Sequence, residues 1–282
     1  MDNILNLEDI KKALIAISNN LSLPARETIL FENFGKHILE ISLILNNVGG
    51  NGNILDVGGG LGINLLCIKN LCRNLIRKNK IELNLYLLDK FEEYTKENRM
   101  GEDSFAVKLM ENEDIKVYKQ DFWINPVLPF KSNFFDLVTI LDVTEHLPGH
   151  PLKILSEIKR VLKPGGKVIL GGPNAFSLMK RIRFLLGKHP HIPLDIWIKE
   201  KYFSHYREYG INEHKLLLEK VGFKILKVIP SIEPLKTQII SWYKKLGKKF
   251  FSVKNLVMCI IFIIKLIFTR LRPSVYLIAL ND

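Results

Sequence analysis

Apolar residues follow two different spacings along this chain, and the two kinds of segment alternate. Short, mostly apolar runs favour strands, and the nearly all-apolar run Phe135–Leu141 favours a strand buried on both faces of a sheet. The runs lie at Asn53–Val57, Leu83–Leu88, Ile115–Lys119, Phe135–Leu141, Lys167–Leu170, Phe223–Val228 and Ser274–Ala279. Segments with helical spacing run from Ile63 to about Lys78, over Pro151–Leu162 and over Asn212–Val221. This alternation predicts an α/β fold with a doubly wound, mostly parallel, seven-stranded sheet.

The first part of the chain has helical spacing alone. One helix is expected from about Leu7 to Ile17 and a second over roughly Arg26–Leu45. The run Asn46–Gly52 (N-N-V-G-G-N-G) then supplies helix-stop and turn residues. We therefore expect an N-terminal helical segment over residues 1–50 and an α/β domain over residues 51–282.

Two insertions interrupt the alternation inside the α/β domain. They cover residues 172–210 (Gly172–Gly210), after the fifth strand, and residues 230–273 (Pro230–Pro273), between the sixth and seventh. Both leave from carboxyl ends of strands, which is the edge where open α/β sheets bind ligands. We therefore expect both insertions on the active face.

The stretch Ile54–Gly62 (I-L-D-V-G-G-G-L-G) joins the first strand to the helix that follows. Glycines without Cβ atoms let backbone N–H groups approach a ligand closely, and the open helix N-terminus adds a positive dipole end. An ordinary strand-to-helix turn would look similar. We favour a nucleotide-type ligand because three acids, Asp56, Asp89 and Asp121, also border this turn or follow the next strands.

Two of the three acids, Asp89 and Asp121, have specific expected roles. A carboxylate at the end of the second strand, Asp89, can accept hydrogen bonds from both hydroxyls of a ribose. Asp121 with Phe122 can receive an adenine amino group and pack against its ring. Asp also ends strands and caps helices for structural reasons alone. Their expected position at one edge of the sheet favours a binding site.

These motifs together resemble the class I S-adenosylmethionine-dependent methyltransferases. The resemblance covers roughly Ile54–Val228 and is carried by D-V-G-G-G-L-G, L-L-D, Q-D-F, F-D-L-V-T-I-L-D-V-T-E-H-L and R-V-L-K-P-G-G-K-V-I-L-G-G-P-N. It implies S-adenosyl-L-methionine as cofactor. Asp56, Gly58, Gly60 and Gly62 would line its methionine and ribose part, Asp89 would bind the ribose, Asp121 and Phe122 the adenine, and Asp142 would lie beside the sulfonium. The rival dinucleotide fingerprint G-x-G-x-x-G fails, because its third glycine would fall on Ile63.

Candidate groups for the acceptor side follow the fourth strand and the first insertion. His146, with Glu145, is the nearest candidate base for a hydroxyl acceptor. Asp142, Glu145 and His146 form D-x-x-E-H, which resembles the E-x-x-E-H metal set of ubiquinone-biosynthesis O-methyltransferases. We favour a role for Glu145 and His146 in orienting the loop, and assign no metal ligand. His205, in the run H-Y-R-E-Y-G, marks the acceptor side, and this run resembles methyltransferases of cell-surface glycan and lipid pathways.

The formal net charge of +12 is concentrated near the C-terminus, where Leu235–Asn281 holds nine basic residues and no acid. Within it, Lys244–Lys254 is basic and Leu256–Phe268 is apolar apart from Lys265. This pattern favours a helix in the interface of an anionic membrane, although a core-covering helix is the alternative. A lipid-linked or small amphiphilic acceptor, such as a polyprenyl-phosphate-linked glycan, a quinone precursor or a glycolipid, would suit such a lid. Nucleic-acid methylation is less favoured, because the basic stretch is mixed with aliphatic residues, and a non-catalytic relative remains a further alternative.

The start of the chain and its cysteines bear on the compartment. Met1–Ile10 lacks the basic start and apolar core of a signal peptide, and the three cysteines show no metal-type spacing or disulfide framework. We therefore expect a cytoplasmic protein, with association to the cytoplasmic membrane face left open. The spacing of motifs does not distinguish O-, N- and C-methylation or fix the oligomeric state.

Overall fold

The computed structural model describes most of the 282-residue chain. The described residues are 7–21, 26–27, 29–30, 33–79, 82–91, 105–191, 194, 198, 205–233 and 253–282, and the side chains of 74–79, 105 and 253–259 are outside this description. Seven strands form one sheet in the order β3-β2-β1-β4-β5-β7-β6. The predicted doubly wound α/β fold is therefore confirmed.

The strands match the apolar runs of the sequence closely. They are β1 (Asn51–Val57), β2 (Glu82–Asp89), β3 (Lys116–Lys119), β4 (Phe135–Leu141), β5 (Leu162–Pro173), β6 (Lys224–Ser231) and β7 (Ser274–Leu280). β7 is antiparallel to both β5 and β6, whereas β1 to β5 pair in parallel. The central strands β1 and β4 are buried along most of their length, as expected for strands covered on both faces.

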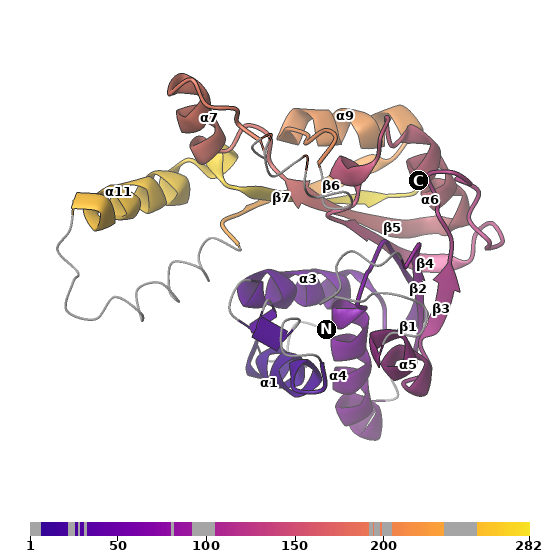
Figure 1. Ribbon diagram of the computed structural model, residues 1–282. Helices are drawn as coiled ribbons and strands as arrows, with labels where there is room; N and C mark the ends of the chain where they lie inside the picture. The colour runs from indigo at the N-terminus through magenta and orange to yellow at the C-terminus, as the bar shows by residue number, and fades with distance from the viewer. Residues whose placement is uncertain are drawn as a thin grey trace.

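Helices cover both faces of the sheet (Figure 1). On one face lie α1 (Leu7–Ser18), α3 (Phe34–Asn47), α4 (Ile63–Asn79) and α5 (Phe105–Asn112), and on the other α6 (Leu152–Val161) and α9 (Ile211–Val221). Each layer has its own core of buried apolar side chains. α1 and α3 pack on α4, so the N-terminal helices share the first core with the sheet. The second predicted helix, Arg26–Leu45, is seen as α3, which begins only at Phe34; part of the preceding segment lies outside the described residues.

The fifth strand differs from the prediction. The apolar run predicts a strand that starts at Lys167, but β5 already begins at Leu162. The backbone explains this difference, because Gly165 N–H donates to Asn281 O (2.7 Å) and Asn281 N–H donates to Gly166 O (2.8 Å). Between the pairs Phe135–Leu162 and Leu137–Lys167 the extra residues form a bulge.

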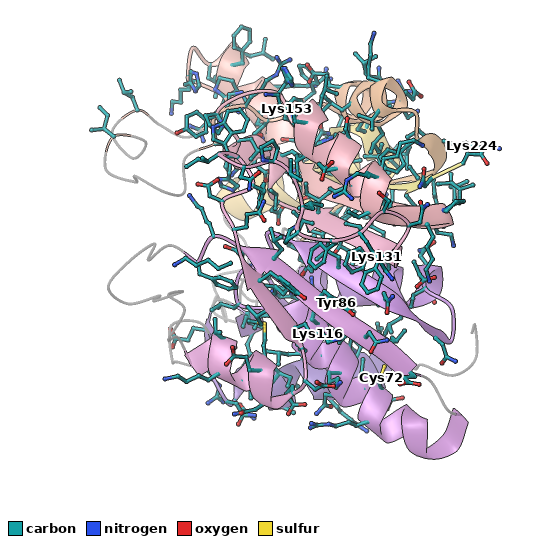
Figure 2. The ribbon with its side chains drawn as sticks, turned by 90° about the vertical axis from the view of Figure 1, so that its right-hand side faces the viewer. Cys72, Tyr86, Lys116, Lys131, Lys153 and Lys224 are labelled. Atoms are coloured by element: carbon teal, nitrogen blue, oxygen red, sulfur yellow. The ribbon has the colours of Figure 1, made fainter. Side chains whose placement is uncertain are left out.

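Aromatic rings support the edge of the sheet where β2 and β3 pair. The Tyr86 ring packs edge-on against Phe130 and Phe135 at centroid distances of 6.0 and 5.2 Å. Lys116 Nζ donates a hydrogen bond to the Tyr86 hydroxyl (3.2 Å), and the two residues lie side by side in Figure 2. This packing holds the β2–β3 edge, whose carboxyl ends carry two of the predicted acids.

Both insertions leave the same edge of the sheet. Pro173, Ser231 and Ser274 are aligned across β5, β6 and β7, so the chain departs and returns at one level. The described helices of the insertions, α7 (Leu178–Leu185) and α11 (Val253–Ile267), extend beyond this edge (Figure 1). Asn174 Nδ2 donates to the carbonyls of Arg270 and Arg272 (2.9 Å each), which joins the two insertions at their base. Within the described part of the chain, no helix has the length and apolar character needed to cross a membrane.

Candidate functional site

The glycine turn between β1 and α4 has a backbone that only glycine adopts easily. Gly58, Gly60 and Gly62 have φ angles of 73°, 54° and 66°, in the left-handed region. A Cβ on Gly58 would lie 2.4 Å from Val143 Cγ2, and one on Gly62 would lie 2.0 Å from Met110 Sδ. Both positions therefore need glycine for conformation and for space. The turn also brings backbone N–H groups to the edge of the sheet.

Asp89 is fixed against this turn, as the sequence predicted for a shared site. Its carboxylate accepts hydrogen bonds from Gly60 N–H at Oδ2 (3.0 Å) and from Phe91 N–H at Oδ1 (3.0 Å). Burial raises the pKa of Asp89, and these backbone donors counteract the rise. Each oxygen has further lone pairs, so the carboxylate can also accept hydroxyl donors of a ligand.

Asp56 lies beneath the glycine turn. Its side chain is 3% exposed, and the Thr139 hydroxyl donates to Oδ1 (2.6 Å). A Cβ on Gly59 would lie 2.5 Å from Asp56 Oδ2, so the turn closes directly over the carboxyl group. Burial raises the pKa of Asp56 to about 7, with smaller contributions from Glu40 and Asp89, while the Thr139 hydrogen bond lowers it.

Asp121 and Phe122 follow β3 and border Asp89. Gln120 N–H donates to the Asp89 carbonyl (2.9 Å), which places this segment beside the second strand. Asp121 Oδ1 accepts hydrogen bonds from the backbone N–H groups of Trp123 (2.9 Å) and Ile124 (3.2 Å). Phe122 is partly buried and packs against the core on the α6 face. The carboxylate of Asp121 therefore holds its own turn, and the hydrogen bond from Gln120 keeps this segment beside Asp89.

Asp142 directly follows β4 at the carboxyl end of the strand, in a left-handed conformation with φ 51°. Its N–H donates to the Gly171 carbonyl (2.9 Å), and its carboxylate forms an ion pair with Lys36 of α3. Lys36 Nζ also lies 4.0 Å from the buried carboxylate of Glu40. Sequence reasoning missed Lys36, because it lies in a helix without any motif. The helix α3 therefore reaches the carboxyl edge of the sheet.

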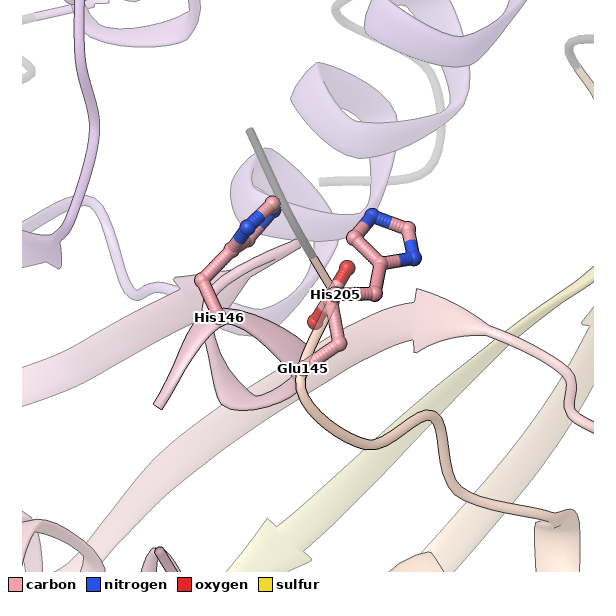
Figure 3. Close-up of side chains that lie close together, drawn as sticks. All are labelled: Glu145, His146 and His205. Carbon is pink, nitrogen blue, oxygen red and sulfur yellow. The ribbon is translucent and has the colours of Figure 1, made fainter. Parts of the chain in front are cut away.

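Glu145, His146 and His205 come together from two distant segments (Figure 3). Their oxygen and nitrogen ligand atoms all lie within 4.8 Å of one another, and the two imidazole rings are 4.7 Å apart, edge to face. Tyr206 N–H donates to the Glu145 carbonyl (2.8 Å), which fixes the segment of His205 to the loop after β4. Burial raises the pKa of Glu145 to about 7. Asp142 is not part of this cluster, so the structure assembles a different set from D-x-x-E-H.

Glu208 supports this cluster from behind, and the sequence analysis did not single it out. Its nearly buried carboxylate accepts a hydrogen bond from His205 Nδ1 (2.8 Å) and forms an ion pair with Lys180 of α7. His191 Nδ1 lies 3.5 Å from Glu208 Oε1, the oxygen that His205 also contacts. Burial, together with nearby cationic groups, lowers the pKa of His205 to about 3. The only signal for Glu208 in the sequence is its position in the run H-Y-R-E-Y-G, which also contains His205.

Comparison with protein families gives one match over most of the chain. A family model described as a methyltransferase domain matches residues 28–228. An uncharacterized protein of Methanocaldococcus jannaschii is 34% identical over 129 residues, which cover 45% of this chain and 51% of that protein. The demethylmenaquinone methyltransferase of Bacillus licheniformis is 31% identical over 126 residues, which cover 41% of this chain and 53% of that protein. The chain thus spans about half the length of the curated relatives it matches.

Solved structures share the fold at low sequence identity. Phosphoethanolamine N-methyltransferase 2 of Haemonchus contortus, in complex with S-adenosyl-L-methionine, is 18% identical with a TM-score of 0.55, covering 96% of this chain and 56% of that one. A putative sarcosine dimethylglycine methyltransferase from Galdieria sulphuraria is 18% identical with a TM-score of 0.54, covering 97% and 98%. At such identities the likeness concerns the fold.

Proposed function

Because this chain belongs to the methyltransferase-domain family, we propose that it transfers a methyl group from S-adenosyl-L-methionine to an oxygen of an amphiphilic acceptor. The observation that carries this proposal is the link between the glycine turn and Asp89, in which Gly60 N–H holds the carboxylate. In that geometry a ligand can approach the backbone N–H groups closely, and a carboxylate with two oxygens can accept its hydroxyl hydrogen bonds at the same point. A nucleoside ligand requires both. The fold shared with a structure that contains S-adenosyl-L-methionine also supports it.

The residues of the turn fit this cofactor. Gly58, Gly60 and Gly62 would leave room for it, and Asp89 would accept its ribose hydroxyls. Asp121 and Phe122 would border the adenine, while Asp56 would support the turn from beneath. When bound, S-adenosyl-L-methionine supplies an electrophilic methyl group on a positively charged sulfur. Asp142 at the end of β4 provides a carboxylate on the same edge.

Methyl transfer to a hydroxyl also requires that its proton leaves. The oxygen forms the new bond to carbon, the carbon–sulfur bond breaks, and the hydroxyl proton passes to the protein or solvent. Glu145, His146 and His205 gather at the carboxyl edge and can receive that proton or hold the acceptor in line. Glu208 fixes the orientation of His205.

The surface around this edge favours an amphiphilic acceptor and contact with an anionic membrane. α7 exposes Phe184 and Leu185, and α11 exposes Ile263 and Ile267, all by more than half of their surface. The segment Leu235–Asn281, which contains α11, has nine basic residues and no acidic ones. Exposed apolar side chains flanked by positive charge are typical of helices that lie in a membrane interface. One similar protein, 31% identical over 41% of this chain, is named for demethylmenaquinone, which supports a quinone-type acceptor.

Two measurements test the function. Calorimetry should show that S-adenosyl-L-methionine binds, whereas a nicotinamide dinucleotide should not. A labelled methyl group from the cofactor should then appear in the lipid fraction of an extract. Transfer to RNA instead would favour the nucleic-acid alternative, and cofactor binding without transfer to any fraction would favour a non-catalytic relative. Absence of cofactor binding would contradict the proposal as a whole.

A further inference from the structure

We propose that Glu145, His146 and His205 bind a divalent first-row transition-metal ion. Any part that the ion plays in methyl transfer rests on the proposed function, whereas its binding does not. The three ligand atoms already lie within 4.8 Å of one another, and Figure 3 shows the side chains converging. Metal–ligand bonds of about 2.0 to 2.2 Å bring ligand atoms to about 3 Å from one another, so rotation of these side chains would close the site.

The backbone around the cluster is already fixed. Glu145 and His146 belong to one short 3-10 helix, η2 (Thr144–His146). The Glu145 carbonyl accepts hydrogen bonds from the N–H groups of Tyr206 (2.8 Å) and Arg207 (3.3 Å), so the two segments are joined next to the ligands. His205, the third ligand, lies about sixty residues further along the chain than the other two. The spacing of D-x-x-E-H therefore cannot indicate it.

Glu145 has an oxygen that a cation would satisfy. The side chain is 1% exposed, and within the described residues its Oε2 has no hydrogen-bond partner. A buried carboxylate oxygen without a partner is costly, because it has lost water and gained nothing in return. A divalent ion among Glu145 and two imidazoles would remove this cost.

Glu208 gives His205 the arrangement usual for a metal-binding histidine. The Nδ1–H group of His205 donates to Glu208 Oε1 (2.8 Å), so Nε2 is left to face the cluster. Such a carboxylate behind a histidine fixes the tautomer and orientation of the ring. Glu208 is itself paired with Lys180, and Asp142 with Lys36. Both lysines are thus paired with carboxylates that are not among the three ligands.

The ligand types select the kind of ion. Two imidazoles and one carboxylate suit Zn²⁺, Co²⁺, Mn²⁺ or Fe²⁺, whereas Mg²⁺ and Ca²⁺ prefer oxygen ligands throughout. Three protein ligands leave coordination positions open. An acceptor hydroxyl or a water molecule in such a position would have a lower pKa and lose its proton more easily. The ion would therefore ease the proton loss that the proposed function requires, and the proton would pass to solvent, because the three side chains are occupied as ligands.

Cobalt titration of the untagged, metal-free full chain tests this proposal by a readout that does not need activity. Co²⁺ should bind at one equivalent with visible d–d absorption, Zn²⁺ should abolish the bands, and excess Mg²⁺ should leave them unchanged. Glu145→Gln and His205→Ala should abolish the bands, and Glu208→Gln should weaken Co²⁺ about tenfold to a hundredfold. His150→Ala changes an exposed histidine outside the cluster and should bind Co²⁺ like the unmodified chain.

The comparison separates a metal site from other outcomes. The folding of each variant is first compared with that of the unmodified chain by circular dichroism and thermal unfolding. If His205→Ala does not fold, Glu208→Gln still tests the proposal, because it keeps all three ligands. Absence of d–d bands, bands that persist in Glu145→Gln, or displacement of Co²⁺ by Mg²⁺ would each overturn the proposal. A protein that binds Co²⁺ as expected but transfers no methyl group would contradict the proposed function alone.

Discussion

The glycine turn buries the carboxyl group of Asp56, because the turn closes directly over it. Burial raises the pKa of Asp56 from 3.8 to about 7. Between these values the folded chain keeps a proton that the unfolded chain has lost, so the contribution of Asp56 to the free energy of unfolding should fall as pH rises through this window. The whole pKa shift changes the free energy of unfolding by on the order of 4 kcal/mol. Urea unfolding at several pH values from 4 to 8 measures this slope.

Asp56→Asn is the matched variant for that slope. Asn cannot titrate, but its side-chain oxygen can still accept the hydrogen bond from the Thr139 hydroxyl. We expect the variant to lose the contribution of Asp56 to the pH dependence between about 4 and 7, while Glu145 keeps its own. A slope that is the same in both proteins would show that Asp56 does not keep its proton in the fold.

Asp89 is the residue on which cofactor affinity should depend most directly. Asp89→Asn replaces a charged acceptor by a neutral amide with one acceptor oxygen, while its size is nearly unchanged. Hydrogen bonds to charged groups contribute about 1.5 to 3 kcal/mol, so the affinity for S-adenosyl-L-methionine should fall about tenfold to a hundredfold. Calorimetry checks this, with Asp114→Asn as the control, because the side chain of Asp114 is 89% exposed. Equal losses in both variants would contradict the assignment.

The residues of this site differ in how far the sequence could predict them. The glycines and Asp89 stand in a motif whose chemistry is local, so their proximity followed from strand and turn order. Lys36 and Glu208 contact the site from a helix and an insertion without motifs, and only tertiary packing brings them there. Asp56 was expected to line the cofactor, and its burial beneath the turn depends on how closely Gly59 approaches it.

At the scale of elements, α3 is attached to the sheet by buried polar contacts. Glu40 accepts hydrogen bonds from the Tyr276 hydroxyl of β7 (3.0 Å) and from Asn64 Nδ2 of α4 (2.9 Å). A buried carboxylate needs such donors, since its own charge is costly away from water. These bonds fix the helix that carries Lys36 toward Asp142. The apolar stripe of the sequence predicted a helix here, but not that it reaches the site.

The exposed face of α11 gives a prediction for this element. Ile263→Asp with Ile267→Asp should reduce pelleting with anionic liposomes at least about tenfold, because each buried isoleucine contributes about 1.5 kcal/mol or more. Leu216→Asp is the control, since Leu216 is similarly exposed but lies on α9, outside both insertions. Unchanged pelleting of the α11 variant would favour the alternative in which this helix covers another part of the protein.

At the scale of the molecule, the sequence predicted the sheet, whereas ligand binding at its carboxyl edge stays a prediction. The order of strands follows from short connections and from apolar runs that need cover on both faces. The insertions are harder, because their length permits many paths and their apolar residues fit a core helix or a membrane helix equally well. Pro173, Ser231 and Ser274 show that both leave at one level of the sheet. The basic stretch Lys244–Lys254 lies mostly outside the described residues.

Cofactor binding should also be visible in the stability of the whole molecule. A ligand that binds only the folded state at about one hundred times its dissociation constant adds about 2.7 kcal/mol to the free energy of unfolding. For a chain of 282 residues this corresponds to a rise in Tm of about 4 to 5 °C. S-adenosyl-L-methionine should produce this rise, a nicotinamide dinucleotide should produce none, and Asp89→Asn should need about tenfold to a hundredfold more cofactor for the same shift. Because the glycine turn joins β1, α4 and, through Asp89, β2, a ligand held there stabilises the centre of the sheet. An equal shift with the dinucleotide would instead favour the rival interpretation of the turn.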